Sequence, residues 1–234
     1  MKKFINYFSK TEKLLWLFSS LFIIVSFIIF DRKNYLTLSS SLVGVSSLIF
    51  VAKGNPIGQV MMIFFSLIYG IISYNYSYYG EMITYLGMSM PMAIFSLVSW
   101  LRNPFNGNKA EVTINRISKK ECCFLFLLAS AVTAAFYFIL RFFNTANLIP
   151  STVSITTSFV AVYLTLRRNP YYAFWYALND IVLIVLWVLA TFDNISYISV
   201  VVCFVVFLAN DLYGFYNWLK MEKRQKKLQT DQFK

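Results

Sequence analysis

The stretch YYAFWYALNDIVLIVLWVLA, residues 171–190, contains one charged side chain, Asp180. A helix of this length rises about 30 Å at ~1.5 Å per residue, which matches the hydrocarbon thickness of a bilayer. The run is unbroken, whereas a strand of a transmembrane barrel would alternate apolar and polar residues over about ten positions. The stretch therefore predicts a membrane-spanning α-helix.

Comparable apolar runs fill most of the chain. The 234 residues are 59% hydrophobic and 13% charged, whereas an ordinary soluble domain has roughly 25% charged residues. The first run lacks a small-residue cleavage site after its apolar core, so we interpret it as an anchor and not as a removed signal peptide. We predict an all-α integral protein of the cell membrane with eight transmembrane helices. These are residues 14–30, 36–52, 57–74, 82–101, 122–140, 150–166, 171–191 and 196–218.

The positive charges are distributed unevenly across this predicted bundle. With eight spans both termini lie on one side, and that side holds all 21 Lys and Arg residues except Arg32, Lys33 and Arg141. Because Lys and Arg are enriched in cytoplasmic loops, we predict that both termini are cytoplasmic. The net charge of +11 is then a consequence of topology, with the lipid bilayer as partner, and does not indicate a nucleic acid.

Several chemistries have no support in the composition. Histidine is absent, which removes the commonest metal ligand and general base and argues against zinc proteases and Ser-His hydrolases. Cys122, Cys123 and Cys203 lie in or next to apolar spans, and we interpret them as small hydrophobic residues. We therefore predict no metal site, no cofactor and no catalytic residue.

Similar segments predict an internal duplication. The turn KGNP at residues 53–56 returns as RRNP at residues 167–170, 114 positions later, and Trp100 and Trp218 close the fourth and eighth spans. A unit of three helices crosses the membrane an odd number of times, so a connector helix is needed to give both copies one orientation. We predict two parallel three-helix repeats joined by a connector (3+1+3), plus one N-terminal helix, an arrangement known among transporters. The predicted divisions are 1–35 for the basic lead and extra helix, 36–101 for the first repeat, 102–140 for the cytoplasmic loop and connector, 141–220 for the second repeat and 221–234 for the cytoplasmic tail.

Polar side chains within the spans indicate a candidate binding site. Trp175 and Asn179 lie one turn apart on one helix face, and Asn210, Tyr213 and Asn217 form a stripe on the last helix. A ring one turn from an amide offers a flat heterocyclic ligand a stacking surface and a directional hydrogen bond, with added attraction for a cationic ring. We expect the stripe to face Trp175 and Asn179. The predicted substrate-binding residues are Trp175, Asn179, Asp180, Asn210, Tyr213, Asn217 and Tyr85.

Other interpretations of these residues remain open. Asn and Tyr also bond across membrane helices as packing contacts. Asp180 and Asp211 either bind substrate or anchor their helices, because charges inside a span face a partner or a cavity. We interpret Glu81 as a solvated rim residue and Trp100 and Trp218 as members of an interfacial aromatic belt.

Three motifs occur in a distinctive order. NPYYAFWYALND, with Trp175 and Asn179 in a Trp-x-x-x-Asn spacing, is followed by IVLWVLATF and by ANDLYGFYNW. With the repeat, these motifs resemble the PnuC-type vitamin transporters over about residues 35–220, whose best-known members carry nicotinamide riboside. The resemblance implies a relative of the SWEET transporters, a trimeric homo-oligomer, and contacts from Trp175, Asn179, Asn210 and Tyr213 to the vitamin. It also implies facilitated diffusion, with trapping by a cytoplasmic kinase.

The sequence thus favours a transporter that imports nicotinamide riboside for NAD biosynthesis, and not an enzyme. A transporter of thiamine or riboflavin is the alternative, since each of these vitamins has a flat ring with polar substituents. A membrane enzyme that uses Asp180 and Asp211 as an aspartyl pair, or a structural membrane subunit, has less support, because neither Gly-x-Gly-Asp nor Tyr-Asp occurs.

Overall fold

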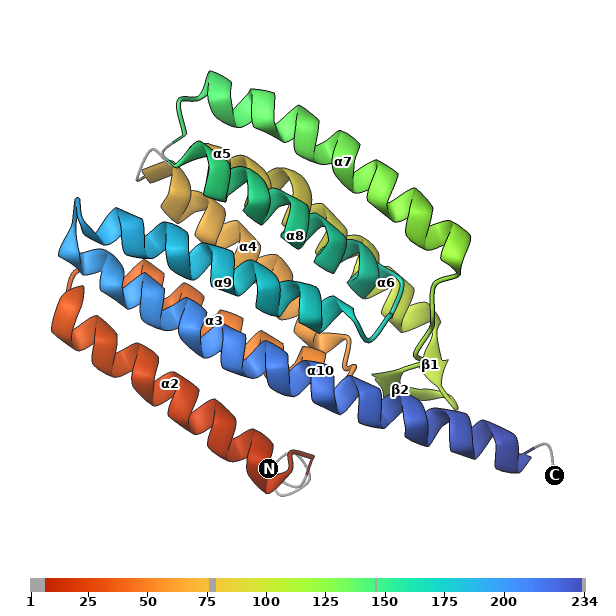
Figure 1. Ribbon diagram of the computed structural model, residues 1–234. Coiled ribbons are helices and arrows are strands. Elements are labelled where there is room, and N and C mark those ends of the chain that lie inside the picture. The colour runs from red at the N-terminus through yellow and green to blue at the C-terminus, as the bar shows by residue number, and fades with distance from the viewer. Residues whose placement is uncertain (1–6, 76–78, 146, 233–234) are drawn as a thin grey trace.

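The computed structural model describes residues 7–75, 79–145 and 147–232 and is a bundle of long helices (Figure 1). Within these residues, 8 helices are long and apolar enough to cross a membrane, which confirms the predicted class. The spans are α2 Lys10–Phe30, α3 Tyr35–Ala52, α4 Ile57–Asn75, a composite span Tyr79–Arg102, α7 Lys119–Phe142, α8 Leu148–Leu166, α9 Tyr172–Thr191 and α10 Ile198–Gln232.

The two Asn-Pro turns have the same backbone geometry. Gly54 and Arg168 both have a positive φ, 66° and 56°, which ends α3 and α8 with a left-handed residue. The next residue is an asparagine in each case, and its Oδ1 accepts a hydrogen bond from the backbone N–H two positions later, at 2.9 Å for Asn55 and 3.0 Å for Asn169. The same short motif therefore makes the same sharp turn twice.

The fourth span is not a uniform α-helix. It consists of α5 Tyr79–Thr84, a π-helical turn η1 Tyr85–Ser89 and α6 Met90–Arg102. The backbone N–H of Met90 donates to the carbonyl of Tyr85, five residues earlier, and Pro91 follows in the first turn of α6. Single π-turns of this kind are frequent at functional sites, and this one begins at Tyr85, whose ring packs against Phe65 and Tyr69.

A β-hairpin connects the two halves at the end of the bundle that carries both termini. Strands β1 Pro104–Phe105 and β2 Asn108–Val112 are antiparallel, and the turn between them has positive φ at Asn106 and Gly107, as a tight hairpin requires. The N–H of Val112 donates to the carbonyl of Gly54 at 2.9 Å, and that of Asn115 donates to the carbonyl of Arg168 at 3.1 Å. One loop is thereby tied to both Asn-Pro turns.

The extension of α10 beyond the bundle packs on the same loop. Arg116 donates two hydrogen bonds to the Glu222 carboxylate, at 2.8 and 2.7 Å. This bonded carboxylate raises the pKa of the Arg116 guanidinium, so the pair stays charged at physiological pH. Gln225 adds hydrogen bonds to the backbone of Val112 and Ile114. The predicted tail is therefore a continuation of α10, held in place by the loop.

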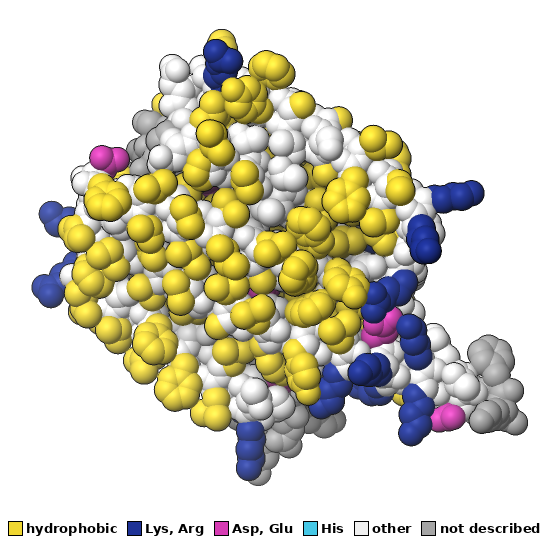
Figure 2. Space-filling model, viewed as in Figure 1, with side chains coloured by type: hydrophobic (Ala, Val, Ile, Leu, Met, Phe, Trp, Pro, Cys, Tyr) yellow, Lys and Arg dark blue, Asp and Glu magenta, His cyan; other side chains and the backbone are white. Residues whose placement is uncertain are grey.

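Two spans lie at the edges of the bundle. Figure 1 shows α2 and α7 on opposite sides, with 22% and 17% of their apolar windows buried; the composite span is also only 22% buried, but it lies between them. Hydrophobic side chains cover the visible face of the helices in Figure 2, while Lys and Arg gather mainly at the end that carries both termini. The inner set of helices is thus α3, α4, the composite span, α8, α9 and α10.

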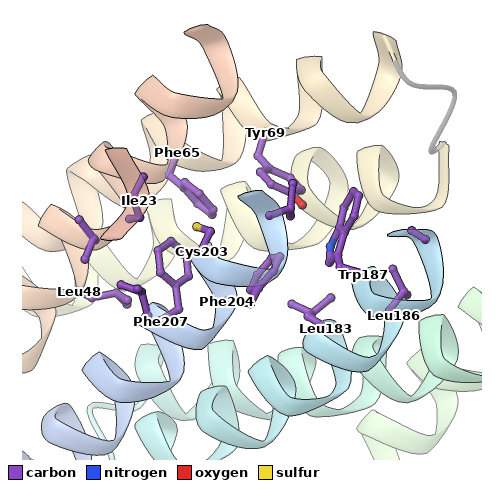
Figure 3. Packing of buried hydrophobic residues seen from close by; sticks show 14 residues of the cluster. Ile23, Leu48, Phe65, Tyr69, Leu183, Leu186, Trp187, Cys203, Phe204 and Phe207 are labelled. Atoms are coloured by element: carbon purple, nitrogen blue, oxygen red, sulfur yellow. The ribbon is translucent and has the colours of Figure 1, made fainter. Parts of the chain in front are cut away.

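Two buried apolar clusters divide the interior along its length. The outer cluster, far from the termini, includes Tyr69, Trp187 and Phe204, and the inner cluster, near the termini, includes Trp100, Tyr172 and Trp218. Several members of the outer cluster are drawn in Figure 3.

The aromatic-belt interpretation of Trp100 and Trp218 is wrong. Both side chains are 0% exposed, and their rings lie 5.4 Å apart. The indole of Trp100 donates to the carbonyl of Thr165 at 2.9 Å, and that of Trp218 donates to the carbonyl of Val51 at 2.8 Å. Both carbonyls are in the last turn of a helix, and each also accepts a backbone hydrogen bond from the turn that follows, from Arg168 N–H to Thr165 and from Gly54 N–H to Val51. Each indole thus bonds to a helix-end carbonyl in the other half of the molecule. A pseudo-two-fold axis would produce this reciprocity. The parallel repeat stays a prediction.

Candidate functional site

A cavity lies between the outer and inner clusters, and all six inner helices line it. The space is narrow, with about 70 Å³ open to the centres of water-sized molecules. Its walls include Phe65, Glu81 and Tyr85 from α4, α5 and η1, and Asn179 and Asp211 from α9 and α10. Both predicted three-helix units therefore contribute side chains, whereas α2 and α7 contribute none among the described lining residues.

One face of α9 supplies the largest polar part of this lining. Tyr172, Tyr176, Asn179, Asp180 and Leu183 all border the cavity. Their spacing of four, three, one and three residues keeps them on one side of a helix with ~3.6 residues per turn. The face therefore presents two phenol rings, an amide and a carboxyl group along about two and a half turns.

The side chain of Asn179 is held in one orientation by α8. Its Oδ1 accepts hydrogen bonds from Ser154 Oγ at 3.0 Å and from Thr157 Oγ1 at 2.8 Å. These two bonds occupy both lone pairs of the carbonyl oxygen, so the amide NH₂ group is the part of the side chain left for a ligand. Asn179 is thus a fixed hydrogen-bond donor, only 7% exposed, in the wall of the cavity.

Three acids line the same cavity. Asp180 and Asp211 are 4% and 5% exposed, and they border the cavity from the neighbouring helices α9 and α10. Asp180 Oδ2 has no hydrogen-bond partner among the described residues. Glu81, interpreted from the sequence as a solvated rim residue, instead borders this cavity and a smaller pocket beside Asp193. None of the described lining residues is Lys or Arg.

Aromatic side chains close the cavity on its outer side. Phe65 of α4 and Phe207 of α10 lie 5.8 Å apart, and Phe204 packs on Phe207 at the same centroid distance (Figure 3). Gly44 of α3 makes this packing possible, because a Cβ atom there would lie 2.5 Å from Cζ of Phe207. Tyr85 packs on Tyr69 at 4.5 Å. The outer wall is thus a set of rings in mutual contact.

The predicted stripe on α10 points elsewhere. Asn210 Nδ2 donates to Ser19 Oγ of α2 at 2.9 Å, and the Tyr213 hydroxyl donates to Glu12 of α2 at 3.1 Å. Asn217 Nδ2 donates to the carbonyl of Ala52, the last residue of α3, at 2.8 Å. These residues do not face Asn179, in contrast to the expected arrangement, because α2 and the end of α3 cover that side of α10.

Trp175 also lies outside the cavity lining. It is partly buried and packs against the inner cluster. The aromatic rings that do border the cavity from α9 are those of Tyr172 and Tyr176, which the sequence analysis did not select. Their signal was present, since Tyr172, Tyr176 and Asp180 follow one another at intervals of four residues. Of the predicted residues, the structure brings Asn179, Asp180 and Tyr85 together around the cavity.

Comparison with known proteins identifies the family to which the chain belongs. Residues 34–220, which include every described cavity residue, match the family model of the nicotinamide mononucleotide transporter. The chain belongs to this family. It is therefore a multi-pass membrane transporter of a small molecule and not an enzyme.

Curated members of the transporter family are similar over most of their length. The nicotinamide riboside transporter PnuC of Neisseria mucosa is 26% identical over 216 residues, which cover 89% of this chain and 81% of that protein. The protein of the same name from Haemophilus influenzae is 24% identical over 193 residues, with 82% of each chain covered. These relatives place the chain among the PnuC-type transporters.

A solved transporter shares the fold. The crystal structure of the vitamin B3 transporter PnuC superposes with a TM-score of 0.80 at 23% identity, over 93% of this chain and 94% of that chain. The arrangement of helices that surrounds the cavity is thus a known PnuC architecture.

Proposed function

We propose that the protein imports nicotinamide riboside by facilitated diffusion and that the central cavity is its binding site. The curated relatives are named for this riboside, whereas the family model is named for the mononucleotide. The two compounds differ by a phosphate group, which carries about −1.5 to −2 charges near pH 7. The charges of the cavity can therefore distinguish between them.

The acid-lined cavity is the observation that carries the proposal. A phosphate in this cavity would lie near Glu81, Asp180 and Asp211, with no Lys or Arg among the described lining residues to compensate it. Burying an unpaired charge beside like charges is strongly unfavourable. The riboside, whose pyridinium ring is positive and whose ribose is uncharged, has the complementary charge.

The residues around the cavity suit the parts of this ligand. In the proposal, the amide NH₂ of Asn179 donates to the carboxamide oxygen, and Tyr85 and Tyr176 offer ring faces to the pyridinium. Asp180 supplies negative charge. Trp175, Asn210, Tyr213 and Asn217, which were predicted as contacts, act through the packing of α9 and α10 in this scheme.

Trapping by phosphorylation completes the proposed uptake. Cytoplasmic phosphorylation would keep the inward gradient of free riboside and would give a product that the acid-lined cavity rejects. The predicted orientation, with both termini in the cytoplasm, is supported by the Lys and Arg residues at that end of the bundle. Proton coupling is not required, and liposomes test this directly: riboside flux should follow its own gradient and should not be driven uphill by an imposed pH gradient.

Calorimetry on the purified protein tests the substrate. Nicotinamide riboside should bind, and nicotinamide mononucleotide and neutral riboflavin should bind at least about 100-fold more weakly, a difference of ~2.7 kcal/mol. Thiamine is the second candidate, because its ring is also a cation. Preferential binding of thiamine would replace the riboside as substrate, and preferential binding of the mononucleotide would contradict the proposal.

A further inference from the structure

We propose that the Asp180–Asp211 carboxyl pair selects the charge of the transported ring, so that the carrier accepts a flat monocationic heterocycle and rejects the neutral form of the same molecule. This inference rests on the proposed function and adds a specificity rule to it. Neither the family match nor the similarity to the curated relatives assigns a role to this pair.

The pair has no protein cation of its own. Both carboxyl groups are at least 95% buried. Among the described residues, neither takes part in an ion pair, and no Lys or Arg borders the cavity. Asp180 Oδ2 borders the cavity without a hydrogen-bond partner among the described residues. A buried carboxylate of this kind is costly unless a positive group pairs with it. The missing positive group can come from a ligand.

In the part of the chain that the structure describes, the surroundings of the pair contain no competing positive charge. Tyr172 and Tyr176 lie on α9, Cys203 lies on α10, and Tyr85 and Glu81 approach from η1 and α5. Every one of these groups is neutral or acidic. The field in the cavity therefore attracts cations, and the tyrosine rings add a cation–π contribution.

The two carboxyl groups border one narrow cavity, and this limits the charge that they carry together without a ligand. Two buried carboxylates that share one site repel each other, so ionisation of both is strongly disfavoured. The empty pair therefore holds about one negative charge, which a single monocation neutralises. A neutral ring of the same shape would fill the cavity and leave that charge without compensation.

A matched ligand pair tests this rule. Nicotinamide riboside has a pyridinium cation, and its dihydro form has a neutral ring of nearly the same outline. Equilibrium binding to the purified full chain should favour the cation on the order of 100-fold, as expected when a buried charge loses its partner. In Asp180→Asn and, separately, Asp211→Asn, the preference should fall to a few-fold, chiefly through weaker binding of the cation. Asp231→Asn, in the exposed last turns of α10, is the matched carboxyl-to-amide control and should keep the full preference.

The outcomes separate the inference from the proposed function. Equal binding of both ring forms to the unmodified protein would overturn the charge rule and leave riboside transport intact. An unchanged preference in both folded variants would show that the pair only holds α9 and α10 together, and would also overturn it. Binding of neither form would remove the proposed function and the inference together. The preference of the unmodified protein for the cationic over the neutral ring tests the charge rule even where a variant does not fold.

Discussion

Asn-Asp occurs on α9 as residues 179–180 and on α10 as residues 210–211, and the side chains of the two dipeptides have different surroundings. On α9 both side chains border the cavity. On α10 Asp211 borders it, whereas Asn210 turns to α2 and donates to Ser19. The reason is the neighbourhood of each helix, because α10 is covered by α2 and α3 on the side away from α9. A polar dipeptide in a membrane helix thus acquires its role from the helices beside it.

The largest expected effect is on riboside binding, and it distinguishes Asn179 from Asn210. Asn179→Leu removes the amide donor that Ser154 and Thr157 hold in place, so binding of nicotinamide riboside should fall at least about 100-fold. The protein should stay monodisperse in detergent, because the change increases the apolar character of the wall. Calorimetry with size-exclusion chromatography measures both properties. Binding that is unchanged in a folded Asn179→Leu protein would break the comparison.

The second-largest expected effect is on the free energy of unfolding, and it also distinguishes Asn210 from Asn179. Asn210→Leu removes the hydrogen bond to Ser19 and places a larger side chain against α2, so the free energy of unfolding should fall by about 1–3 kcal/mol. Riboside binding should change only a few-fold. Thermal unfolding in detergent, followed alongside calorimetry, gives both values. A variant that loses binding as completely as Asn179→Leu, at an unchanged melting temperature, would place Asn210 in the site instead.

The third prediction changes the cavity face of α10 without altering either dipeptide. A Cβ atom at Gly44 meets the Phe207 ring at 2.5 Å, so Gly44→Ala should push that ring toward the cavity and weaken riboside binding about tenfold. Gly214→Ala, on α10 itself, is the matched control, because its nearest neighbours would be at 3.7 Å, an ordinary contact. Equal effects of the two substitutions on the dissociation constant would show that Phe207 does not shape the site.

The smallest expected effect concerns a pair of residues that the two halves use alike. Trp100→Phe and Trp218→Phe each remove one indole N–H from a helix-end carbonyl, at Thr165 or Val51. Loss of the hydrogen bond should lower the free energy of unfolding by about 0.5–1.5 kcal/mol in each variant, because the carbonyl keeps its bond from Arg168 or Gly54, and riboside affinity should stay nearly unchanged. Thermal unfolding checks this. A much larger loss of stability in one of the two variants would show that the two halves are less alike here than at the Asn-Pro turns.

The sequence predicted the spans and turns well, because both depend on local properties. Apolar length defines a membrane helix, and the Asn-Pro motif defines a turn wherever it occurs. The site was predicted only in part. Asn179 and Asp180 border the cavity, but the stripe through Tyr213 is covered by α2, and no local pattern states which face of a polar helix a distant segment will cover.

Two other features also depended on tertiary structure. Trp100 is a belt residue by composition and position, yet it is buried because it packs against Trp218 and donates to the carbonyl of Thr165 at the end of α8. Glu81 lies near the end of its span in the sequence, yet it borders the cavity next to the π-helical turn η1, and the irregular backbone that follows it cannot be read from residue types alone.

A structure of the protein with nicotinamide riboside bound tests the central claim most directly. The account predicts the ligand in the cavity, with the pyridinium ring beside Asp180 and Asp211 and the carboxamide within hydrogen-bond distance of Asn179. Ligand density on the far side of α10, among Asn210, Tyr213 and α2, or beside Trp175 and away from the acids, would contradict it.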